Sequence, residues 1–470
     1  MASLAGLLAR LGYAVTGSDQ GAYPPMSTLL EREGIPVSTP FRPANLPPGV
    51  RAVVVGNAIS RGNPELEAAL DLGLPLVSFP ETLRELVLRT RRPLVVAGTH
   101  GKTTTTSLAA WMLRTAGRDS GFLVGGIAGG LGTSFRLGAA GEPFVVEGDE
   151  YDTAYWDKGP KFLHYLPEVA IIGNVEFDHA DIYADFAAVR RAFSFLARLP
   201  PRRGLLLLGA DSPAAAALRS AAHTTVETFS VPASGGAPVE GVDWAGTVES
   251  LGARGGRLHV TRGGEPWPAL EGPFWGWASG RNLLAAAAAS VRMGVEWEAI
   301  REAARSFRGV VRRLEPIGAS TDRKLRVVRD FAHHPTAVEA VLDAAGRRWP
   351  AAARVVVFEP RSFTSRSSVF QGRFAAAFAG ASHVLLAAPA AGSRGRRPDR
   401  DRSLDLDRLA SDLAAGGIPA EVGDDAEEIV ARSVELADGP GETVLLFLSN
   451  GHFGGIPEAT ARALSLPGPG

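Results

Sequence analysis

The chain has 470 residues, no cysteine and a formal net charge of −1, with 45% hydrophobic and 21% charged residues. This length predicts about three globular domains, and the lack of cysteine excludes disulfides, thiolate zinc sites and a cysteine nucleophile. The near-neutral charge argues against nucleic acid or an anionic membrane as a partner, and because we find neither a signal peptide nor an apolar run of about 18 residues, we expect a cytoplasmic protein.

Residues 1–90 alternate between helical and extended patterns. We expect helices at 3–11, 29–34 and 64–72, and strands at 13–19 and 50–56. This alternation predicts a parallel sheet covered by helices. The first strand ends at Asp19. An acid at this place either holds a ribose or base edge or caps a turn, and the spacing does not distinguish the two.

A second α/β unit follows a predicted linker at 89–93. Its first strand, Pro93–Ala97, leads into Gly98-Thr99-His100-Gly101-Lys102-Thr103-Thr104, and a helical pattern starts at Ser107. A strand, a glycine loop with Lys-Thr and a helix form the arrangement that holds a nucleoside triphosphate. Loop N–H groups approach the phosphates, Lys102 meets the β- and γ-phosphates, and the Thr103 hydroxyl reaches Mg²⁺.

Lysine is rare in this chain, with four lysines against 45 arginines. Retention of lysine at position 102 indicates a need for a compact ammonium rather than a planar guanidinium. Codon bias would produce the same scarcity, so this observation only supports the phosphate-loop interpretation.

Acidic clusters follow two buried strands of the second unit. Residues 147–152, Glu-Gly-Asp-Glu-Tyr-Asp, follow the strand 143–147, and residues 174–179, Asn-Val-Glu-Phe-Asp-His, follow the strand 169–174. A divalent cation such as Mg²⁺, which prefers oxygen ligands, is the simplest neutraliser of such a cluster. A solvated acidic turn is the alternative, but a position at the carboxyl end of a strand, in a domain with a phosphate loop, favours Mg²⁺.

The third unit starts near residue 314, with strands expected at 325–328, 354–358, 383–386 and 443–447. Its first strand leads into Asp330-Phe331-Ala332-His333-His334-Pro335, where the neighbouring histidines are also typical of ordinary core or capping groups. We expect residues 391–402 to form a surface loop and the tail after Ser465 to be frayed.

Together these motifs resemble those of the Mur ligase family, the ATP-dependent amide-forming enzymes of peptidoglycan synthesis. The loop 98–104, the run 309–315 and the segment 330–335 are similar to the family's phosphate loop, hinge and third-domain signature. The resemblance implies an α/β fold of three domains. These are a Rossmann-like domain for UDP-N-acetylmuramate (1–90), a central P-loop ATPase domain (93–313) and a Rossmann-like C-terminal ligase domain (314–470).

In this family a muramate carboxylate attacks the γ-phosphate of ATP, and an amine then displaces phosphate from the acyl phosphate. The resemblance implies that Gly98, Thr99, His100, Gly101, Lys102, Thr103 and Thr104 bind ATP and that Asn282 meets its adenine. It also implies that Thr103 and Glu147 hold one Mg²⁺, with Glu150 as an alternative to Glu147, and that His179 helps to hold a second.

The resemblance assigns the remaining candidates to the hinge and the substrates. Arg313 and Asp330 contact the nucleotide, so that the catalytic set is Lys102, Glu147, His179, Arg313 and Asp330. Ser18 and Asp19 lie near the uridine, and the other candidates for substrate binding are Asp152, Lys158, Lys161 and His333. An interdomain salt bridge at Arg313 and solvent-exposed charge at the two lysines are the simpler alternatives.

Residues 150–158 and 161–165 resemble the recycling branch of the family, which joins UDP-N-acetylmuramate to the murein tripeptide L-alanyl-γ-D-glutamyl-meso-diaminopimelate. The branch that adds L-alanine alone usually has E-S-D-A-S where this chain has Glu-Tyr-Asp-Thr-Ala. We therefore expect a tripeptide ligase that acts as a monomer or weak dimer. An L-alanine ligase, a non-catalytic nucleotide- or UDP-sugar-binding homologue and, more distantly, a P-loop motor or transport ATPase are the alternatives.

Two segments depart from the family pattern. The family opens with a strand and a G-x-x-G-T-x-M loop for the UDP pyrophosphate, whereas this chain starts at Met1-Ala2-Ser3. The first strand is therefore expected to be missing and UDP-sugar binding to be weak. The family's G-x-H-N-x-x-N segment reads Gly-Arg-Asn-Leu-Leu-Ala from residue 280, so Arg281 replaces a histidine and its stacking on adenine is an open question.

Overall fold

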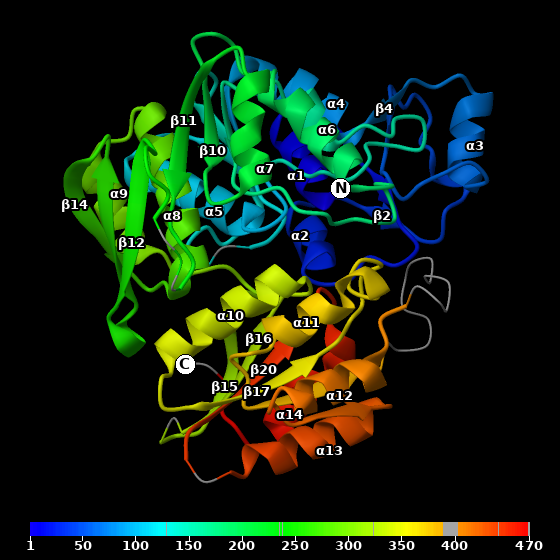
Figure 1. Cartoon of the computed structure of the whole chain (residues 1–470). Helices are drawn as coiled ribbons and strands as arrows, with labels where there is room; N and C mark the ends of the chain where they lie inside the picture. Colours follow the sequence, from blue (N-terminus) through cyan, green and yellow to red (C-terminus); the bar gives the residue numbers. More distant parts are fainter. Residues whose placement is uncertain are drawn as a thin grey trace.

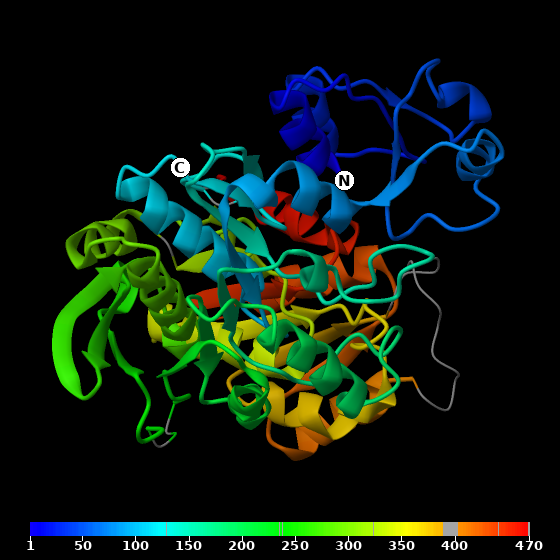
Figure 2. The same ribbon diagram turned by 90° about the horizontal axis from the view of Figure 1, so that it is seen from above.

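Three α/β regions follow one another along the chain in this computed structural model (Figure 1). The structure describes residues 1–127, 129–234, 236, 238–322, 324–388, 403–439 and 441–468, so the predicted surface loop at 391–402 lies outside the described residues. The N-terminal region lies to one side of the two larger regions (Figure 2). The predicted α/β class is confirmed. Within the described ranges, no helix is long and apolar enough to cross a membrane.

The N-terminal region contains four short strands and four helices among the described residues. Strand β1 (Gly17–Ser18) pairs in parallel with β2 (Val37–Ser38), and β3 (Val53–Val55) pairs in parallel with β4 (Leu76–Ser78). The helices are α1 (Ala2–Arg10), α2 (Met26–Arg32), α3 (Pro64–Asp71) and α4 (Phe79–Leu86), with 3-10 turns η1 (Pro43–Asn45) and η2 (Leu88–Thr90). The single parallel sheet that we expected is therefore two separate pairs, because no described strand bonds to both of them.

The predicted linker at 89–93 is also wrong. Residues 88–90 form η2, and Arg92 already starts the first strand of the central sheet. The apolar side chains Leu83, Val87 and Leu88 pack into the same core as Val95 of the central sheet. Because α4 and η2 have an apolar face of their own, burial against that sheet holds the segment in place.

The central region is built on a sheet whose described strands run in the order β14-β13-β12-β11-β10-β9-β5-β8-β6-β7. Its middle, from β12 to β6, is parallel, and antiparallel pairs lie at both ends, β12–β13 and β13–β14 at one end and β6–β7 at the other. The strands are β5 (Arg92–Ala97), β6 (Gly121–Leu123), β7 (Phe135–Arg136), β8 (Pro143–Glu147), β9 (Val169–Ile172), β10 (Leu205–Gly209), β11 (Thr225–Ser230), β12 (Trp244–Ser250), β13 (Gly256–Arg262) and β14 (Glu265–Gly272).

Helices cover both faces of this sheet. One apolar cluster lies under α5 (Lys102–Thr115), α8 (Gly276–Arg292) and α9 (Trp297–Ser306), and a second lies under α1, α4 and α6 (Phe186–Ala197). The remaining turns are α7 (Pro213–Ala216), η3 (Lys161–His164), η4 (Ala217–Ala221) and η5 (Gly252–Arg254). The parallel strands are thus buried on both sides, which explains their near-continuous apolar sequences.

The C-terminal region has a second sheet with the described strand order β15-β16-β20-β17-β18-β19. Only β15 is antiparallel to its neighbour. The strands are β15 (Glu315–Ala319), β16 (Leu325–Asp330), β17 (Ala353–Phe358), β18 (His383–Ala387), β19 (Ala420–Gly423) and β20 (Thr443–Leu448). The helices are α10 (Pro335–Arg348), α11 (Gln371–Ala377), α12 (Leu406–Ala415), α13 (Ala426–Ala437) and α14 (Ile456–Ala463), with 3-10 turns η6 (Ser368–Phe370) and η8 (Phe453–Gly455).

The start of the tail is packed rather than frayed. The Ala319 N–H donates to the Pro467 carbonyl over 3.3 Å, and Leu466 packs on the apolar cluster under α13 and α14. The expectation of a frayed tail after Ser465 is therefore wrong for Leu466 and Pro467, because the cluster under α13 and α14 and strand β15 give them contacts.

Phe358 at the end of β17 lies at the centre of the C-terminal core. It is fully buried, with ring centroids 5.1 Å from Phe374 and 5.5 Å from Phe378. We expect Phe358→Ala to cost about 3–5 kcal/mol of stability, because it leaves a cavity beside Phe374 of α11 and Phe378, which follows that helix. Differential scanning calorimetry should show a lowered transition for this domain, while Val369→Ala, at a position 65% exposed, leaves it unchanged. Equal transitions for both variants would contradict this core.

Candidate active site

The site is set by the carboxyl ends of three neighbouring strands. In the central sheet β5 lies between β8 and β9, and it is parallel to both. The phosphate loop follows β5, the first acidic cluster follows β8, and the segment 174–179 follows β9. Ligands bind at this edge of open parallel sheets, so three segments distant in sequence meet where a ligand is expected.

The glycines of the loop are required by close approaches. Gly98 has φ of 136°, and a Cβ on it would lie 3.1 Å from the Asn174 carbonyl oxygen. Gly101 has φ of 81°, and its Cβ would lie 2.3 Å from Oδ1 of Asn282. No other residue tolerates this combination of left-handed backbone and contact. The N-terminus of α5, where backbone N–H groups are free for an anion, starts directly after Gly101.

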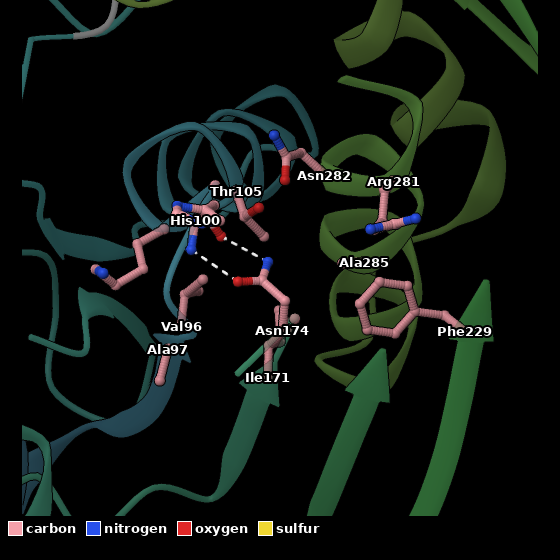
Figure 3. A pocket seen from close by; sticks show the side chains of 13 residues that line it. Val96, Ala97, His100, Thr105, Ile171, Asn174, Phe229, Arg281, Asn282 and Ala285 are labelled. Carbon is pink, nitrogen blue, oxygen red and sulfur yellow. Dashed lines mark hydrogen bonds between the residues drawn. The ribbon is translucent and has the colours of Figure 1, made fainter. Parts of the chain in front are cut away.

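Asn174 clamps the loop from the end of β9. Its Oδ1 accepts from the His100 N–H over 2.8 Å, and its Nδ2 donates to the His100 carbonyl over 3.1 Å (Figure 3). Its own carbonyl accepts from the Thr99 N–H over 3.0 Å. Sequence reasoning gave Asn174 no role, because the clamp joins residues 74 positions apart.

Lys102 belongs to a buried chain of charges. Its ammonium donates to Glu150 over 2.8 Å and to the Gly98 carbonyl over 2.8 Å. Glu150 is 2% exposed and also bonds Nε2 of His179 over 2.9 Å. Burial works against the ammonium charge, but Glu150 and the nearby Asp149 outweigh it and raise the pKa of Lys102. The lysine is therefore held charged at the loop.

His179 is positioned by strained backbone. Its φ is 54°, a left-handed conformation that non-glycine residues rarely adopt and that is concentrated at functional sites. The ring packs 4.2 Å from that of Tyr151. Burial lowers the basicity of the imidazole, but Asp178 and Glu150 prevail and raise the pKa of His179.

Thr103 and Glu147 form a second pair beside the loop. The Thr103 hydroxyl donates to Glu147 over 3.0 Å, and the Gly125 N–H donates to the other carboxylate oxygen over 2.8 Å. Burial raises the pKa of Glu147 despite these bonds and despite Lys102. A hydroxyl and a carboxylate are suitable ligands for a hard divalent cation. Such a cation would stabilise the charged form of Glu147, which burial disfavours.

A small pocket lies between the phosphate loop and α8. His100, Lys102, Asn174, Arg281 and Asn282 are among its lining residues (Figure 3). Its volume of about 10 Å³ is roughly that needed for one water molecule, so a nucleotide has to extend beyond it. Asn282 lies against the loop, as the contact with Gly101 shows.

Arg281 has partners of its own in the protein. Its guanidinium lies 3.1 Å from Asp211, donates to the Val231 carbonyl over 2.9 Å and stacks on Trp277 at 4.6 Å. Burial lowers the pKa of Arg281, and Asp211 counteracts this. Arg281, which replaces the family's histidine, is thus held by residues of its own domain. One face of its guanidinium is already covered by the Trp277 ring.

The hinge brings Arg313 and Asp330 together. Asp330 is 5% exposed and accepts from the N–H groups of Leu314, over 2.7 Å, and Ala332, over 2.8 Å. Arg313 lies over the Phe331 ring at 4.9 Å. His333 bonds the Phe331 carbonyl over 3.0 Å. Asp330 therefore braces the backbone of the hinge, while the Arg313 side chain has no carboxylate partner among the described contacts.

The predicted substrate residues lie in two separate places. Ser18 donates to Glu65 over 2.9 Å, and Asp19 accepts from the Gly21 N–H over 2.9 Å, which is the turn-capping alternative. Near the central loop, Lys161 bonds Asp149 and Lys158 bonds Asp152, each over 2.6 Å. Lys161 is 14% exposed whereas Lys158 is 66% exposed.

Sequence reasoning did not single out the central position of Glu150. Four carboxylates lie within residues 147–152, and only the turn after β8 decides that Glu150, rather than its neighbours, faces both Lys102 and His179. Tyr183, whose hydroxyl donates to the Glu150 carbonyl over 2.8 Å, had no signal in the sequence.

Three family domains match this chain in order. Residues 1–91 match the Mur ligase family catalytic domain, 96–290 the Mur ligase middle domain and 312–450 the Mur ligase glutamate ligase domain. The chain belongs to the Mur ligase family. It is therefore an ATP-dependent ligase that forms a carbon–nitrogen bond.

Two ligases of known name and one crystal structure are similar to nearly the whole chain. The chain is 35% identical over 467 residues, covering 99% of it and 96% of the relative, to the UDP-N-acetylmuramate--L-alanyl-gamma-D-glutamyl-meso-2,6-diaminoheptandioate ligase of Escherichia coli (strain K12). It is 34% identical to the UDP-N-acetylmuramate--L-alanine ligase of Halorhodospira halophila (strain DSM 244 / SL1), covering 100% of this chain and 92% of the relative. The crystal structure of a murein peptide ligase from Psychrobacter arcticus 273-4 superposes with a TM-score of 0.71 at 32% identity, covering 99% of this chain and 96% of that one.

Proposed function

We propose that this protein joins UDP-N-acetylmuramate to L-alanyl-γ-D-glutamyl-meso-diaminopimelate, with conversion of ATP to ADP and phosphate, in peptidoglycan recycling. The observation that carries the proposal is the meeting of Lys102, Thr103, Glu147 and His179 at the carboxyl ends of β5, β8 and β9. The full-length similarity to the Escherichia coli ligase supports the choice of substrates. Because ATP and UDP-sugars are supplied inside the cell, we also infer a cytoplasmic location.

The phosphate loop provides the nucleotide site in this proposal. The amides at the start of α5 and the ammonium of Lys102 bind the β- and γ-phosphates. Thr103 and Glu147 supply oxygen ligands for Mg²⁺, with His179 beside them. When bound, Mg²⁺ neutralises charge on the phosphates as the γ-phosphoryl group is transferred. Arg313, without a carboxylate partner, is available to the nucleotide from the hinge.

The reaction consists of two displacements. A muramate carboxylate oxygen attacks the γ-phosphorus, the bond to the β-phosphate oxygen breaks, and ADP leaves. The amine of the peptide then attacks the acyl carbon, phosphate leaves, and the nitrogen loses a proton. The buried cation of Lys102 stabilises the charge that develops on the transferred group, and the loop fixes its position.

The L-alanine ligase is the second candidate, because a relative with that name matches at nearly the same identity. The sequence Glu-Tyr-Asp-Thr-Ala at 150–154 favours the tripeptide. In the structure Tyr151 packs on His179 and lies 5.9 Å from Nζ of Lys161, which gives this segment a defined shape beside the phosphate loop. A serine at position 151, as in the L-alanine branch, would lack both contacts.

Phosphate release in omission experiments tests the proposal. With Mg²⁺, ATP, UDP-N-acetylmuramate and the tripeptide all present, we expect steady release of phosphate and one ADP per amide formed. Removal of any one component should stop release. Release without the UDP-sugar would instead indicate a P-loop ATPase, and ATP binding without any turnover would indicate a non-catalytic homologue.

Lys161 is expected to contribute to substrate binding more than Lys158. It is 14% exposed, against 66% for Lys158, and it pairs with Asp149 beside the phosphate loop. We expect Lys161→Met to raise the KM for UDP-N-acetylmuramate by about tenfold, the effect of one charge-assisted bond. Lys158→Met is the matched control. Equal KM values for the two variants would contradict this assignment.

A further inference from the structure

A cluster of imidazoles and carboxylates lies where the central region meets the C-terminal region. His100 comes from the phosphate loop, Glu176 from the segment after β9, and His334 from the start of α10, which lies on the face of the C-terminal region nearest the central region (Figure 1). One ligand atom from each of the three lies within 4.8 Å of the other two. The mechanism proposed above does not use Glu176 or His334.

The distances inside the cluster are too long for hydrogen bonds and suitable for a bridging ion. Nε2 of His100 lies 3.7 Å from one Glu176 oxygen, and Nδ1 of His334 lies 3.9 Å from the other. Ligands bound at about 2.0–2.2 Å to one tetrahedral ion are separated by roughly 3.3–3.6 Å. Nδ1 of His334 also accepts from the Thr336 N–H over 3.4 Å, so the small side-chain movements that bring the three atoms onto a common centre would replace this long bond.

Two ring nitrogens of the cluster have no partner among the described residues. Nε2 of His100 and Nε2 of His334 are buried without a hydrogen bond, and the side chain of His334 is fully buried. Buried polar atoms in native proteins nearly always have a partner. The rings pack on each other with centroids 4.6 Å apart, and burial lowers the pKa of both, so they are in the neutral form that binds metals.

The outer contacts of the cluster orient its carboxylate. Glu176 accepts from the Thr336 hydroxyl over 2.8 Å and from Arg373 over 3.1 Å. Asp178, which is 5% exposed, is a second buried carboxylate close to the cluster. A carboxylate held by second partners and a nearby negative charge are typical surroundings of a bound divalent cation.

We propose that His100, Glu176 and His334 form a binding site for a late first-row divalent cation such as Zn²⁺, which bridges the central and C-terminal domains. Two imidazoles and one carboxylate are a donor set that selects zinc and its neighbours over Mg²⁺, which prefers oxygen alone. The site therefore differs in chemistry and in residues from the Thr103–Glu147 pair. It goes beyond the proposed ligase activity, because it ties the phosphate loop to α10.

Cobalt titration tests the site without nucleotide or substrate, so its outcome is independent of ligase activity. Tag-free, chelator-treated protein should take up one Co²⁺ per chain, with visible absorption of a nitrogen- and oxygen-bound ion, and Zn²⁺ should displace it. Glu176→Gln should weaken Co²⁺ binding about tenfold or more. The matched control is His383→Gln, which removes another histidine paired with a glutamate, Glu421.

Three results would overturn the proposal. These are no Co²⁺ absorption with the unmodified protein, unchanged affinity in Glu176→Gln, or equal weakening in His383→Gln. Because His334 caps α10, His334→Gln is a second variant only if its thermal transition without metal equals that of the unmodified protein. Under that condition it should also lose Co²⁺ binding, and retention would count against the site.

Discussion

Lys102→Met is expected to reduce kcat/KM for ATP-dependent amide formation by on the order of 10²–10³-fold, the typical loss when one contact to developing charge is removed. Methionine keeps the apolar stem but loses the cation that Glu150 and the loop carbonyls hold in place. The effect should appear chiefly in kcat, because the charge matters most when the γ-phosphoryl group is transferred.

Two controls separate this effect from a general loss of structure. Lys324→Met removes one of the other three lysines, at an exposed turn of the C-terminal region, and should leave kcat unchanged. Since Lys102→Met leaves the buried Glu150 with His179 as its remaining charged partner, its thermal transition should be measured as well. Full activity of Lys102→Met would contradict the role of the phosphate loop.

Glu147→Gln is expected to raise the Mg²⁺ concentration for half-maximal activity about tenfold and to lower kcat by on the order of 10²-fold. The amide keeps the shape and can still accept from Thr103 or Gly125, but it lacks the negative charge that a hard cation requires. Titration of activity with Mg²⁺ at fixed ATP measures both effects.

The matched control for this variant lies at the other end of the same strand. Glu142 precedes β8 and pairs with Arg118 over 2.8 Å, away from the loop. Glu142→Gln should leave the Mg²⁺ dependence unchanged. If Glu150→Gln, rather than Glu147→Gln, shifts the Mg²⁺ dependence, then the metal lies between Lys102 and His179, and the assignment of Glu147 is wrong.

Much of the central domain could be predicted because its strands are short apolar runs ended by polar residues. The run 143–147 ends at Glu147, and the glycine that follows leaves no room for a side chain, because a Cβ on Gly148 would lie 2.9 Å from Val95 of β5. The strands β12–β14, at one end of the sheet, were not predicted. Their sequences mix charged residues, glycine and proline with apolar ones, so they lack the near-continuous apolar run of strands buried on both faces.

The segments that form the site could be predicted from the sequence, but the tertiary contacts between their side chains could not. The phosphate loop and the acidic segments are local patterns, and the order of parallel strands brings them together. The choice of Glu150 as partner of Lys102 depends on a left-handed residue at His179 and on the turn after β8. Neither feature could be located from the sequence, because left-handed positions are rare for residues other than glycine, even for histidine, which is enriched there.

The resemblance to Mur ligases and the chemistry of the residues support different conclusions about this protein. Spacing alone indicates a triphosphate site at Lys102, and the family adds the carboxylate and amine substrates. Arg281 shows that the role of a family residue cannot always be carried over to the matching position of this chain. It stands where the family has a histidine, yet it pairs with Asp211 and stacks on Trp277.

Competition between the two amines distinguishes the tripeptide ligase from the L-alanine ligase. The protein is incubated with ATP, Mg²⁺ and UDP-N-acetylmuramate in the presence of equal concentrations of the tripeptide and L-alanine, and products are identified by mass spectrometry. We predict that the UDP-N-acetylmuramoyl tripeptide forms almost exclusively, with one ADP per molecule. Predominant formation of UDP-N-acetylmuramoyl-L-alanine would contradict the assignment to the tripeptide.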